Sequence, residues 1–455
     1  MVMTVQASNP VDAAFLALSR DDPGFRPHVG VLLRVRGGAP DARAVREGIA
    51  GRVERMPALA CRVAVRAGRA VWEVDPGFDP CAHVREVVVE DGLASPLPAV
   101  QTLLDVPFAR DSPRWGVWLI HGYACDEWAL LYRAHHGAQD GQAVADAVTA
   151  LFGTGPARRT RDRGDDACVD VVDAVRLWAG VAARTVADLV VGLRSSRSWS
   201  GTRPLTGDPR LWSASVPVRW TREIAAACGA TPNDVCLAAL ADALEAWGPT
   251  RAAPASGADA DVWMSLPVGL RYPHERFTVG NRVSTTRVRL FLGRTTSVAR
   301  VSAIARQTLR VRSTQARAVL RAQLDVLPSA VLKRLLRQGS DHRNGLDTSG
   351  LLSLSGGLAV GADPVVSAAP LLFLHGDHPF TVGFLAWGGR VEVGVVVDRA
   401  WADDGDLARA WAEAVERLWR AVAGDVDASR EPGDAASAES APYRDAAAAG
   451  SGGDA

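Results

Sequence analysis

Two long stretches of the chain mix helical and strand-like patterns, and a segment of different composition separates them. Between residues 153 and 166, glycine, proline, arginine and aspartate replace the apolar pattern that precedes them. Such a composition indicates a linker. On both sides of it, short apolar runs typical of strands occur among segments with the periodicity of amphipathic helices. Because both halves show this mixture, the sequence predicts an α/β fold built from two similar α/β halves.

These patterns divide the 455 residues into four expected parts. Residues 1–152 form a first half, and residues 153–207 form a linker that includes an apolar crossover helix at 169–193. Residues 208–423 form a second half. Residues 424–455 are mostly alanine, glycine, serine and acidic residues, so we expect a disordered tail there.

The patterns also predict individual elements within each half. In the first half we expect helices at 13–18, 40–53, 96–104 and 141–151, and strands at 28–35, 61–65, 70–74, 115–121 and 127–134. In the second half we expect helices at 222–228, 233–247, 296–319 and 406–422, and strands at 261–268, 283–291, 349–354, 371–374, 380–387 and 390–398.

The charge and cysteine content argue against several classes of protein. There are 51 basic and 51 acidic residues, whereas a nucleic-acid-binding protein usually has a basic excess. Nearly all basic residues are arginines, which bind phosphate well, so a phosphorylated ligand such as coenzyme A is compatible with the composition. The six cysteines are scattered without a CxxC pair, so we expect reduced thiols and no metal site.

The sequence also bears on where the protein resides. We see neither a signal peptide at the N-terminus nor an apolar run long enough to span a bilayer. We therefore expect a cytoplasmic protein. The apolar helix at 169–193 could contact the inner face of the membrane peripherally, although packing across the two halves is the simpler expectation.

The candidate site is the heptapeptide His135-His136-Gly137-Ala138-Gln139-Asp140-Gly141, which follows the strand-like run 128–134. An imidazole titrates near neutral pH and can accept a proton from a hydroxyl or amine. Adjacent side chains on a strand point to opposite faces, so the two histidines would rarely share a metal ion. A glycine directly after the aspartate permits a tight turn that a side chain would block.

Several motifs together resemble the wax ester synthase/diacylglycerol acyltransferase family, within the superfamily of chloramphenicol acetyltransferase and condensation domains. The heptapeptide matches the family's HHxxxDG pattern. In the same order as in the family, the chain also contains Pro10-Val11-Asp12-Ala13-Ala14-Phe15-Leu16, Pro113-Arg114-Trp115, Asn233-Asp234, Leu266-Pro267-Val268-Gly269-Leu270-Arg271, Gly280-Asn281-Arg282-Val283-Ser284 and Val397-Asp398. The resemblance extends over about residues 9–422.

The resemblance implies two chloramphenicol-acetyltransferase-like halves with the active site in a tunnel between them. It also implies roles within HHxxxDG. His136 would be the general base, and His135 would point away from the substrate. Asp140 would be a structural ion-pair partner, with Arg271 as one candidate for the other member, and Gly141 would serve the turn. No metal and no redox cofactor is implied.

Other motif residues have both a structural and a functional interpretation. Asn233 and Asp234 are good helix-capping residues, yet the resemblance implies a contribution to activity. Asn281 and Arg282 could position the acceptor, although support of the sheet is the simpler role. The chain departs from the family at Ser353-Leu354-Ser355-Gly356-Gly357, where an SNVPGP-like turn is usual, and this departure puts a neutral-lipid product in doubt.

The expected activity is transfer of an acyl group from a thioester, either acyl-CoA or an acyl-carrier protein, to a hydroxyl of an alcohol, a glyceride or a natural product. A second interpretation is an ester- or amide-forming tailoring acyltransferase of natural-product biosynthesis. A third is a non-catalytic module that binds acyl chains or carrier proteins. The intact histidine motif argues against the third.

Overall fold

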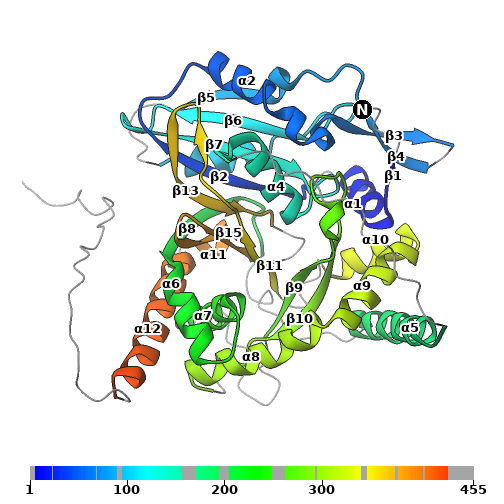
Figure 1. Ribbon diagram of the computed structural model, residues 1–455, viewed down its shortest axis with the longest axis vertical. Coiled ribbons are helices and arrows are strands. Elements are labelled where there is room, and N and C mark those ends of the chain that lie inside the picture. The colour runs from blue at the N-terminus through cyan, green and yellow to red at the C-terminus, as the bar shows by residue number, and fades with distance from the viewer. Residues whose placement is uncertain are drawn as a thin grey trace, which may run out of the picture.

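The computed structural model describes most of the chain, in eleven segments. These are residues 6–22, 24–67, 69–89, 95–155, 171–193, 204–247, 262–292, 295–339, 346–374, 378–402 and 405–428. Figure 1 shows two α/β halves, one above the other, each built on a six-stranded sheet. The predicted fold class, an α/β protein of two halves, is therefore confirmed.

The sheet of the first half has the order β12-β13-β2-β7-β6-β5. Its strands are β2 (His28–Arg36), β5 (Val84–Val88), β6 (Trp115–His121), β7 (Glu127–His135), β12 (Ala359–Val360) and β13 (Asp363–Leu371). A smaller sheet, β1-β4-β3, adds the expected hairpin, with β1 (Gln6–Ala7), β3 (Cys61–Arg66) and β4 (Arg69–Val74).

Helices cover both faces of this first sheet because alternate residues of its strands point to opposite sides. Val31 and Leu33 of β2 share one core with α2 (Ala42–Ala50) and α4 (Gly141–Phe152). Leu32, between them, shares a second core with α3 (Leu97–Leu104). The strand that leads to the histidine motif, β7, is buried along nearly its whole length for the same reason.

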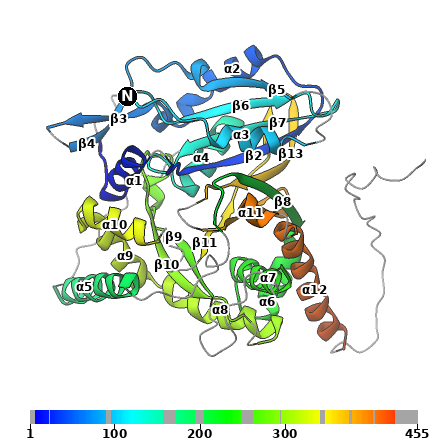
Figure 2. The same cartoon turned by 180° about the vertical axis from the view of Figure 1, so that it is seen from behind.

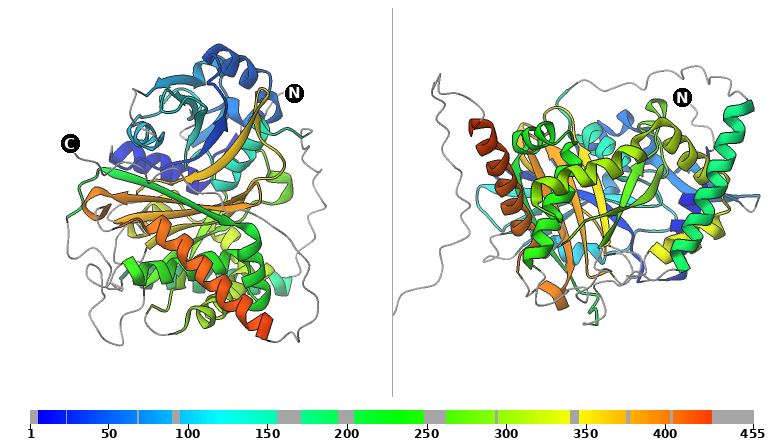
Figure 3. Two further views of the ribbon diagram at one scale, coloured as in Figure 1. Left: turned by 90° about the vertical axis from the view of Figure 1, so that its left-hand side faces the viewer. Right: turned by 90° about the horizontal axis from the view of Figure 1, so that it is seen from below.

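The sheet of the second half has the order β10-β9-β11-β14-β15-β8. Its strands are β8 (Pro209–Pro217), β9 (Trp263–Gly269), β10 (Val283–Arg289), β11 (Leu346–Ser353), β14 (Phe380–Trp387) and β15 (Arg390–Asp398). A core of Val, Leu, Ala and Trp joins this sheet to α6 (Val218–Ala227), α7 (Pro232–Trp247), α8 (Ser297–Arg312) and α12 (Leu407–Ala428). Figure 3 shows these helices below the sheet and the first half above it.

Two consecutive strands, β12 and β13, cross from the second half into the sheet of the first. β13 pairs antiparallel with β2, so that Ala368 lies opposite Leu33, and Figure 1 shows it in gold beside β2. The prediction of a strand at 371–374 was wrong, because the strand ends at Leu371. The two halves are thus joined by backbone hydrogen bonds as well as by side chains.

The second half also contains helices that differ from the prediction. The single helix expected at 296–319 is two helices, because Ser313 has an extended backbone and caps the N-terminus of α9 (Thr314–Val326) through its side chain. A further helix, α10 (Ser329–Gly339), follows. Figure 2 shows α10 and α9 between α1 (Pro10–Asp21) and α5 (Val171–Leu193).

The structure describes part of the expected crossover helix and of the expected tail. Within the described residues, α5 begins at Val171, and Gly180 on it approaches Val319 of α9 closely. At the C-terminus, α12 continues to Ala428, so residues 424–428 are helical and not part of a disordered tail. The remainder of that tail, and residues 156–170 of the linker, lie outside the described residues.

We find no single helix in the described segments that is long and apolar enough to cross a bilayer. Helices α6 and α7 meet the length and composition criteria only as a pair, and they are bent by 97° relative to each other. Most of α7 is buried within the second half.

Candidate active site

The histidine motif is a turn between a central strand and a helix. β7 lies between β2 and β6 and carries the chain to His135. The backbone N–H of His136 then donates to the carbonyl of Pro27, at 2.7 Å. Asp140 caps α4 by accepting the N–H of Ala143, at 2.9 Å. Both ends of the turn are thereby held by the backbone of neighbouring elements.

His135 is buried away from the site, as a neutral structural residue. Its Nδ1 accepts the N–H of Gly137 at 3.0 Å, so the ring proton is on Nε2, which lies 2.9 Å from Oγ of Ser19. Burial, with the positive charge of Arg114 nearby, holds the pKa of His135 well below its usual value. The side chain is buried and does not line the cavity described below.

His136 is only partly buried and lines a cavity between the two halves. Its ring stacks on Phe15 of α1, with centroids 4.8 Å apart and an interplanar angle of 2°, and it meets Phe373 edge-on. Its Nδ1 lies 2.8 Å from Nδ2 of Asn281. Ring position and ring plane are thus determined by three residues that are remote from the motif in sequence.

Asp140 joins the motif to the second half. Nε of Arg271 donates to its two oxygens at 3.1 and 3.0 Å, and the N–H of Arg282 donates at 2.8 Å. Burial raises the pKa of Asp140, but the Arg271 charge and the backbone donors outweigh burial, and the pKa is lowered overall. The ion pair and the backbone donors thus keep this buried carboxylate ionised.

Gly141 has a role that the sequence did not suggest. Its φ is not in the left-handed region, so the turn itself does not require glycine. A Cβ at this position would lie 2.9 Å from Cδ1 of Leu352 on β11. The glycine therefore permits the start of α4 to approach the second sheet closely.

The loop at 280–282 is held between two carboxylates, and one of them was not predicted as a site residue. Asp12 of α1 accepts the N–H of Asn281 at 2.6 Å, while Asp140 accepts the next N–H, that of Arg282. Asp12 also accepts from Nε1 of Trp72 at 2.9 Å. Its place in the motif at 10–16 was the available signal.

Asn233 and Asp234 lie outside the cavity lining and support the elements around it. Asp234 accepts from the N–H and the hydroxyl of Thr231, which precedes α7, and from the hydroxyl of Thr308 on α8. Oδ1 of Asn233 accepts the N–H of Leu351 at 2.8 Å. Asn233 thus positions β11, whose residues line the cavity.

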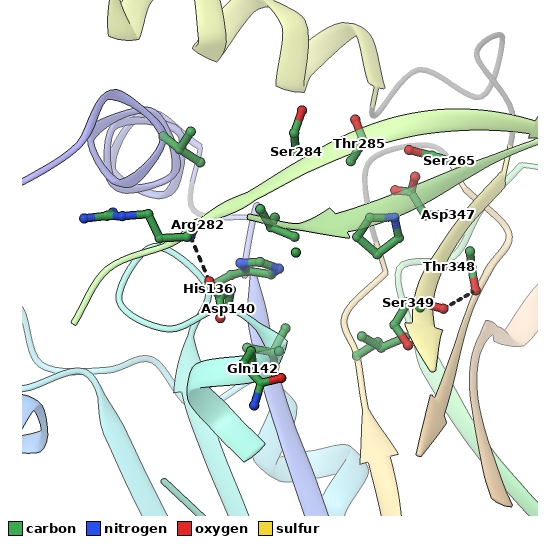
Figure 4. Close-up of a pocket in the computed structure, with 18 of the residues that line it drawn as sticks. His136, Asp140, Gln142, Ser265, Arg282, Ser284, Thr285, Asp347, Thr348 and Ser349 are labelled. Carbon is green, nitrogen blue, oxygen red and sulfur yellow. Dashed lines mark hydrogen bonds between the residues drawn. The ribbon is translucent and has the colours of Figure 1, made fainter. Parts of the chain in front are cut away.

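The cavity has a volume of about 590 Å³ and is lined by residues of both halves. One end is apolar and is formed by α9, α10 and the chain after β13, including Leu324, Leu332, Leu335, Leu336 and Phe373. Another part of the lining is polar. Figure 4 shows Ser265, Asp347, Thr348 and Ser349 on the β9 and β11 side, across from His136.

Within the described segments, no group of histidine, cysteine and acidic residues has the arrangement needed to hold a metal ion. The five cysteines that the structure describes are free thiols, and burial raises the pKa of Cys61 to about 11. No cysteine is among the described residues that line the cavity. Its ionisable groups are those of His136, Asp140, Asp347 and several arginines.

Comparison with known proteins identifies the first half by sequence. Residues 9–167 match the model of the wax ester synthase/diacylglycerol acyltransferase catalytic domain. A probable diacyglycerol O-acyltransferase of Mycobacterium tuberculosis (strain ATCC 25618 / H37Rv) is 26% identical over 259 residues, which are 51% of this chain and 55% of the relative. A putative diacyglycerol O-acyltransferase of the same strain is 26% identical over 316 residues, 61% of this chain and 66% of that protein. The chain thus spans about half the length of the first of these relatives.

Comparison with solved structures identifies the fold of the whole chain. The wax ester synthase/diacylglycerol acyltransferase from Marinobacter aquaeolei VT8 superposes with a TM-score of 0.60, covering 93% of this chain and all of that one, at 19% identity. The first condensation domain of the CDA synthetase has a TM-score of 0.60, covering 93% and 97% of the two chains, at 16% identity. The expected resemblance to the wax ester synthase/diacylglycerol acyltransferase family is confirmed by the matched domain, and the fold is similar to that of the solved family member and of the condensation domain.

Proposed function

We propose that this chain is an O-acyltransferase that moves an acyl group from a thioester to a hydroxyl acceptor, with His136 as the general base. One observation carries the proposal: His136 is the histidine of the motif that lines a cavity between the two halves, and its ring is held by Phe15 and Asn281. A positioned imidazole at a cavity of this size is suited to proton transfer with a bound substrate.

The reaction balances without a cofactor. The imidazole of His136 takes the acceptor's hydroxyl proton as the oxygen attacks the thioester carbonyl. The tetrahedral intermediate then collapses, the C–S bond breaks, and the proton passes from the imidazolium to the departing thiolate. The products are an ester and a free thiol, and His136 returns to its neutral form.

The donor is proposed to be acyl-CoA or an acylated carrier protein. Both carry phosphate, and Arg184, Arg287 and Arg317 line the same cavity as His136. Guanidinium groups bind phosphate through several N–H donors. The leucines of α9 and α10 would accept the acyl chain, since burying each methylene is favourable by about 0.8 kcal/mol.

A second candidate function, ester or amide formation on a polar natural product, is favoured by the polar cavity wall. Asp347, Thr348 and Ser349 line the side of the cavity across from His136. Oγ1 of Thr348 already donates to the carbonyl of Val382, and Oγ of Ser349 accepts the N–H of Phe384. These oxygens can accept further hydrogen bonds, of which a diacylglycerol or a long-chain alcohol has few to offer. A polyol or an amine would bind to them.

The experiment that separates these candidates measures thiol release from acyl-CoAs of short, medium and long chain. Each is offered with an alcohol, a diacylglycerol, a polyol and an amine. We expect release that depends on the acceptor and is abolished in His136→Ala. His121→Ala is the matched control, since His121 pairs with Glu86 at the end of β6 and does not line the cavity.

Equal acceptor-dependent release in wild type and His136→Ala would rule out His136 as the base. No release from either folded protein with any donor and acceptor would favour a module that only binds acyl chains or carriers. Release with polyol or amine, but not with diacylglycerol, would favour the second candidate function. Repeating the assay with an acylated carrier protein in place of the acyl-CoA distinguishes the two donors.

We also propose a cytoplasmic location with a weak peripheral contact between α5 and the membrane. Trp178 and Val186 on this helix are 48% and 60% exposed, and the neighbouring Ala179, Ala182 and Ala183 are exposed as well. Large exposed apolar side chains on one helix favour the interfacial region of a bilayer. Sedimentation with anionic vesicles should weaken in Trp178→Glu, whereas equal sedimentation of both proteins would exclude α5 as the contact.

A further inference from the structure

The side-chain amide of Asn281 is completely buried and has a defined orientation. Its Oδ1 accepts the N–H of Val283 at 3.0 Å, and its Nδ2 donates to the backbone carbonyl of His136 at 3.2 Å. In the reverse orientation the amide NH₂ would face the Val283 N–H, and Oδ1 would face a carbonyl oxygen. Two hydrogen bonds would become two repulsive contacts, so the observed orientation is strongly preferred.

This orientation has a direct consequence for the ring of His136. The second N–H of the same NH₂ group points at Nδ1 of His136, at 2.8 Å. A donor placed there requires an unprotonated Nδ1, and a neutral imidazole then carries its proton on Nε2. We propose that Asn281 is a positioning residue that holds resting His136 in the form with the proton on Nε2.

The backbone of Asn281 is as well fixed as its side chain. Its N–H donates to Oδ1 of Asp12 at 2.6 Å, and its carbonyl accepts from Nδ2 of Asn9 at 2.7 Å. Asn9 and Asp12 in turn form the reciprocal capping box at the start of α1. Because α1 also carries Phe15, the same helix determines both the plane of the His136 ring and the partner of its Nδ1.

The inference rests on the proposed function in one respect only, which is what the ring form of His136 means for catalysis. Nδ1 faces Asn281, so a substrate proton would be accepted at Nε2, which in the resting form already has one. His136 becomes a base when solvent removes the proton from Nε2 and supplies one to Nδ1, with the amide of Asn281 turned so that Oδ1 accepts it. That turn gives up the hydrogen bonds with Val283 and with the His136 carbonyl, so the basic form is the minor form of the resting protein. Until then, Nε2–H is a hydrogen-bond donor, suited to a thioester carbonyl oxygen or to the developing oxyanion.

The test is the protonation state of each ring nitrogen of His136, measured by two-dimensional NMR on the full chain labelled with ¹⁵N-histidine. The His136→Gln spectrum identifies the resonances. For wild type we expect an unprotonated Nδ1 and a protonated Nε2. In Asn281→Asp, whose side chain can only accept at neutral pH, we expect Nδ1 to become protonated.

A wild-type spectrum with the proton on Nδ1 would overturn the inference, and so would an unprotonated Nδ1 in folded Asn281→Asp. If that variant does not fold, the wild-type spectrum alone decides. A role limited to support of the loop predicts no change at Nδ1 in Asn281→Asp. No substrate is present, so failure of the proposed acyl transfer leaves this result intact.

The kinetic counterpart is measured with whichever substrate pair the protein uses. If Asn281 controls the form of the base, Asn281→Asp should change kcat and the pH profile of kcat, with little change in KM. A change confined to KM would instead indicate substrate binding and would contradict the inference.

Discussion

Nε of Arg271 donates to both carboxylate oxygens of Asp140, at 3.1 and 3.0 Å. This ion pair joins the turn after β7 to the segment that follows β9. The two side chains are 5% and 3% exposed. Arg271 also donates to carbonyls of Glu275, Thr278 and Gly280. One ion pair thus anchors the motif of the first half on the loop that positions His136.

We predict that Asp140→Asn destabilises the fold by about 3–5 kcal/mol, because removal of one member leaves the other charge buried without its partner. Urea unfolding measures the loss. Glu47→Gln, which breaks the exposed pair between Arg43 and Glu47, is the control and should cost no more than about 0.5 kcal/mol. Equal effects of the two substitutions would contradict an anchoring role.

The pH dependence of that loss has a definite sign. The folded pKa of Asp140 is lowered from 3.8, so its contribution to stability is present above about pH 4 and is lost as the pH falls through the folded value. The difference in free energy of unfolding between wild type and Asp140→Asn should therefore shrink as the pH falls below about 4.

The contribution of Asp12 to stability should depend on pH in the opposite direction. Burial raises its pKa from 3.8 to about 6, against the hydrogen bond from Trp72 and the charge of Arg282. The folded state therefore binds a proton more readily than the unfolded state, and this group's contribution to stability decreases as the pH rises from about 4 to about 6. Asp12→Asn should lack this decrease, which melting curves at several pH values of both proteins would show.

If the difference between the two proteins does not vary across that pH interval, Asp12 does not titrate there. The unfolding of Asp12→Asn at pH 7 also reports the loss of an acceptor for Asn281, which should cost about 1–3 kcal/mol. Glu275 provides a contrast within the same region, since hydrogen bonds from Arg321 and Tyr272 outweigh its burial and lower its pKa to about 2.

Substitution of His135 should mainly affect stability, whereas substitution of His136 should affect activity. We predict that His135→Ala lowers the free energy of unfolding by about 2–4 kcal/mol, because it leaves a cavity and removes the acceptor of the Gly137 N–H. The protein that remains folded should keep most of its kcat. A folded His135→Ala protein without activity would show that this ring has a part in the reaction.

The apolar end of the cavity should determine the acyl chain length. Leu332 of α10 is 7% exposed and lines this end. We predict that Leu332→Trp lowers kcat/KM for long-chain donors by about tenfold or more relative to short-chain donors, because the indole occupies space that the chain needs. Leu309→Trp is the control, since Leu309 of α8 is 65% exposed. Unchanged chain-length preference would place the acyl chain elsewhere.

The sequence was most informative where a signal is local. The buried strand before His135, the helix from Gly141 and the strands at 61–65 and 70–74 all follow from periodicity and turn chemistry over a few residues. The break at Ser313 is a local signal as well, since serine is a good capping residue. It was missed because the arginine-rich pattern continues across it.

Long-range pairings could not be predicted in the same way. The pairing of β13 with β2 brings residue 368 beside residue 33, and no local pattern states which sheet a strand joins. The contact of Asn281 with His136 spans 145 positions, and that of Asp12 with Asn281 spans 269. The motifs containing these residues were visible in sequence, but their meeting point was not.

By itself, the sequence determined the family resemblance, the two α/β halves and the candidate histidine, because these depend on residue type and spacing along the chain. Only the tertiary structure decided that His135 is buried and His136 lines the cavity, that Gly141 lies against the side chain of Leu352, and that Asn281 faces Nδ1. These properties arise where segments far apart in the chain pack together, and packing depends on the shape and orientation of all of them at once.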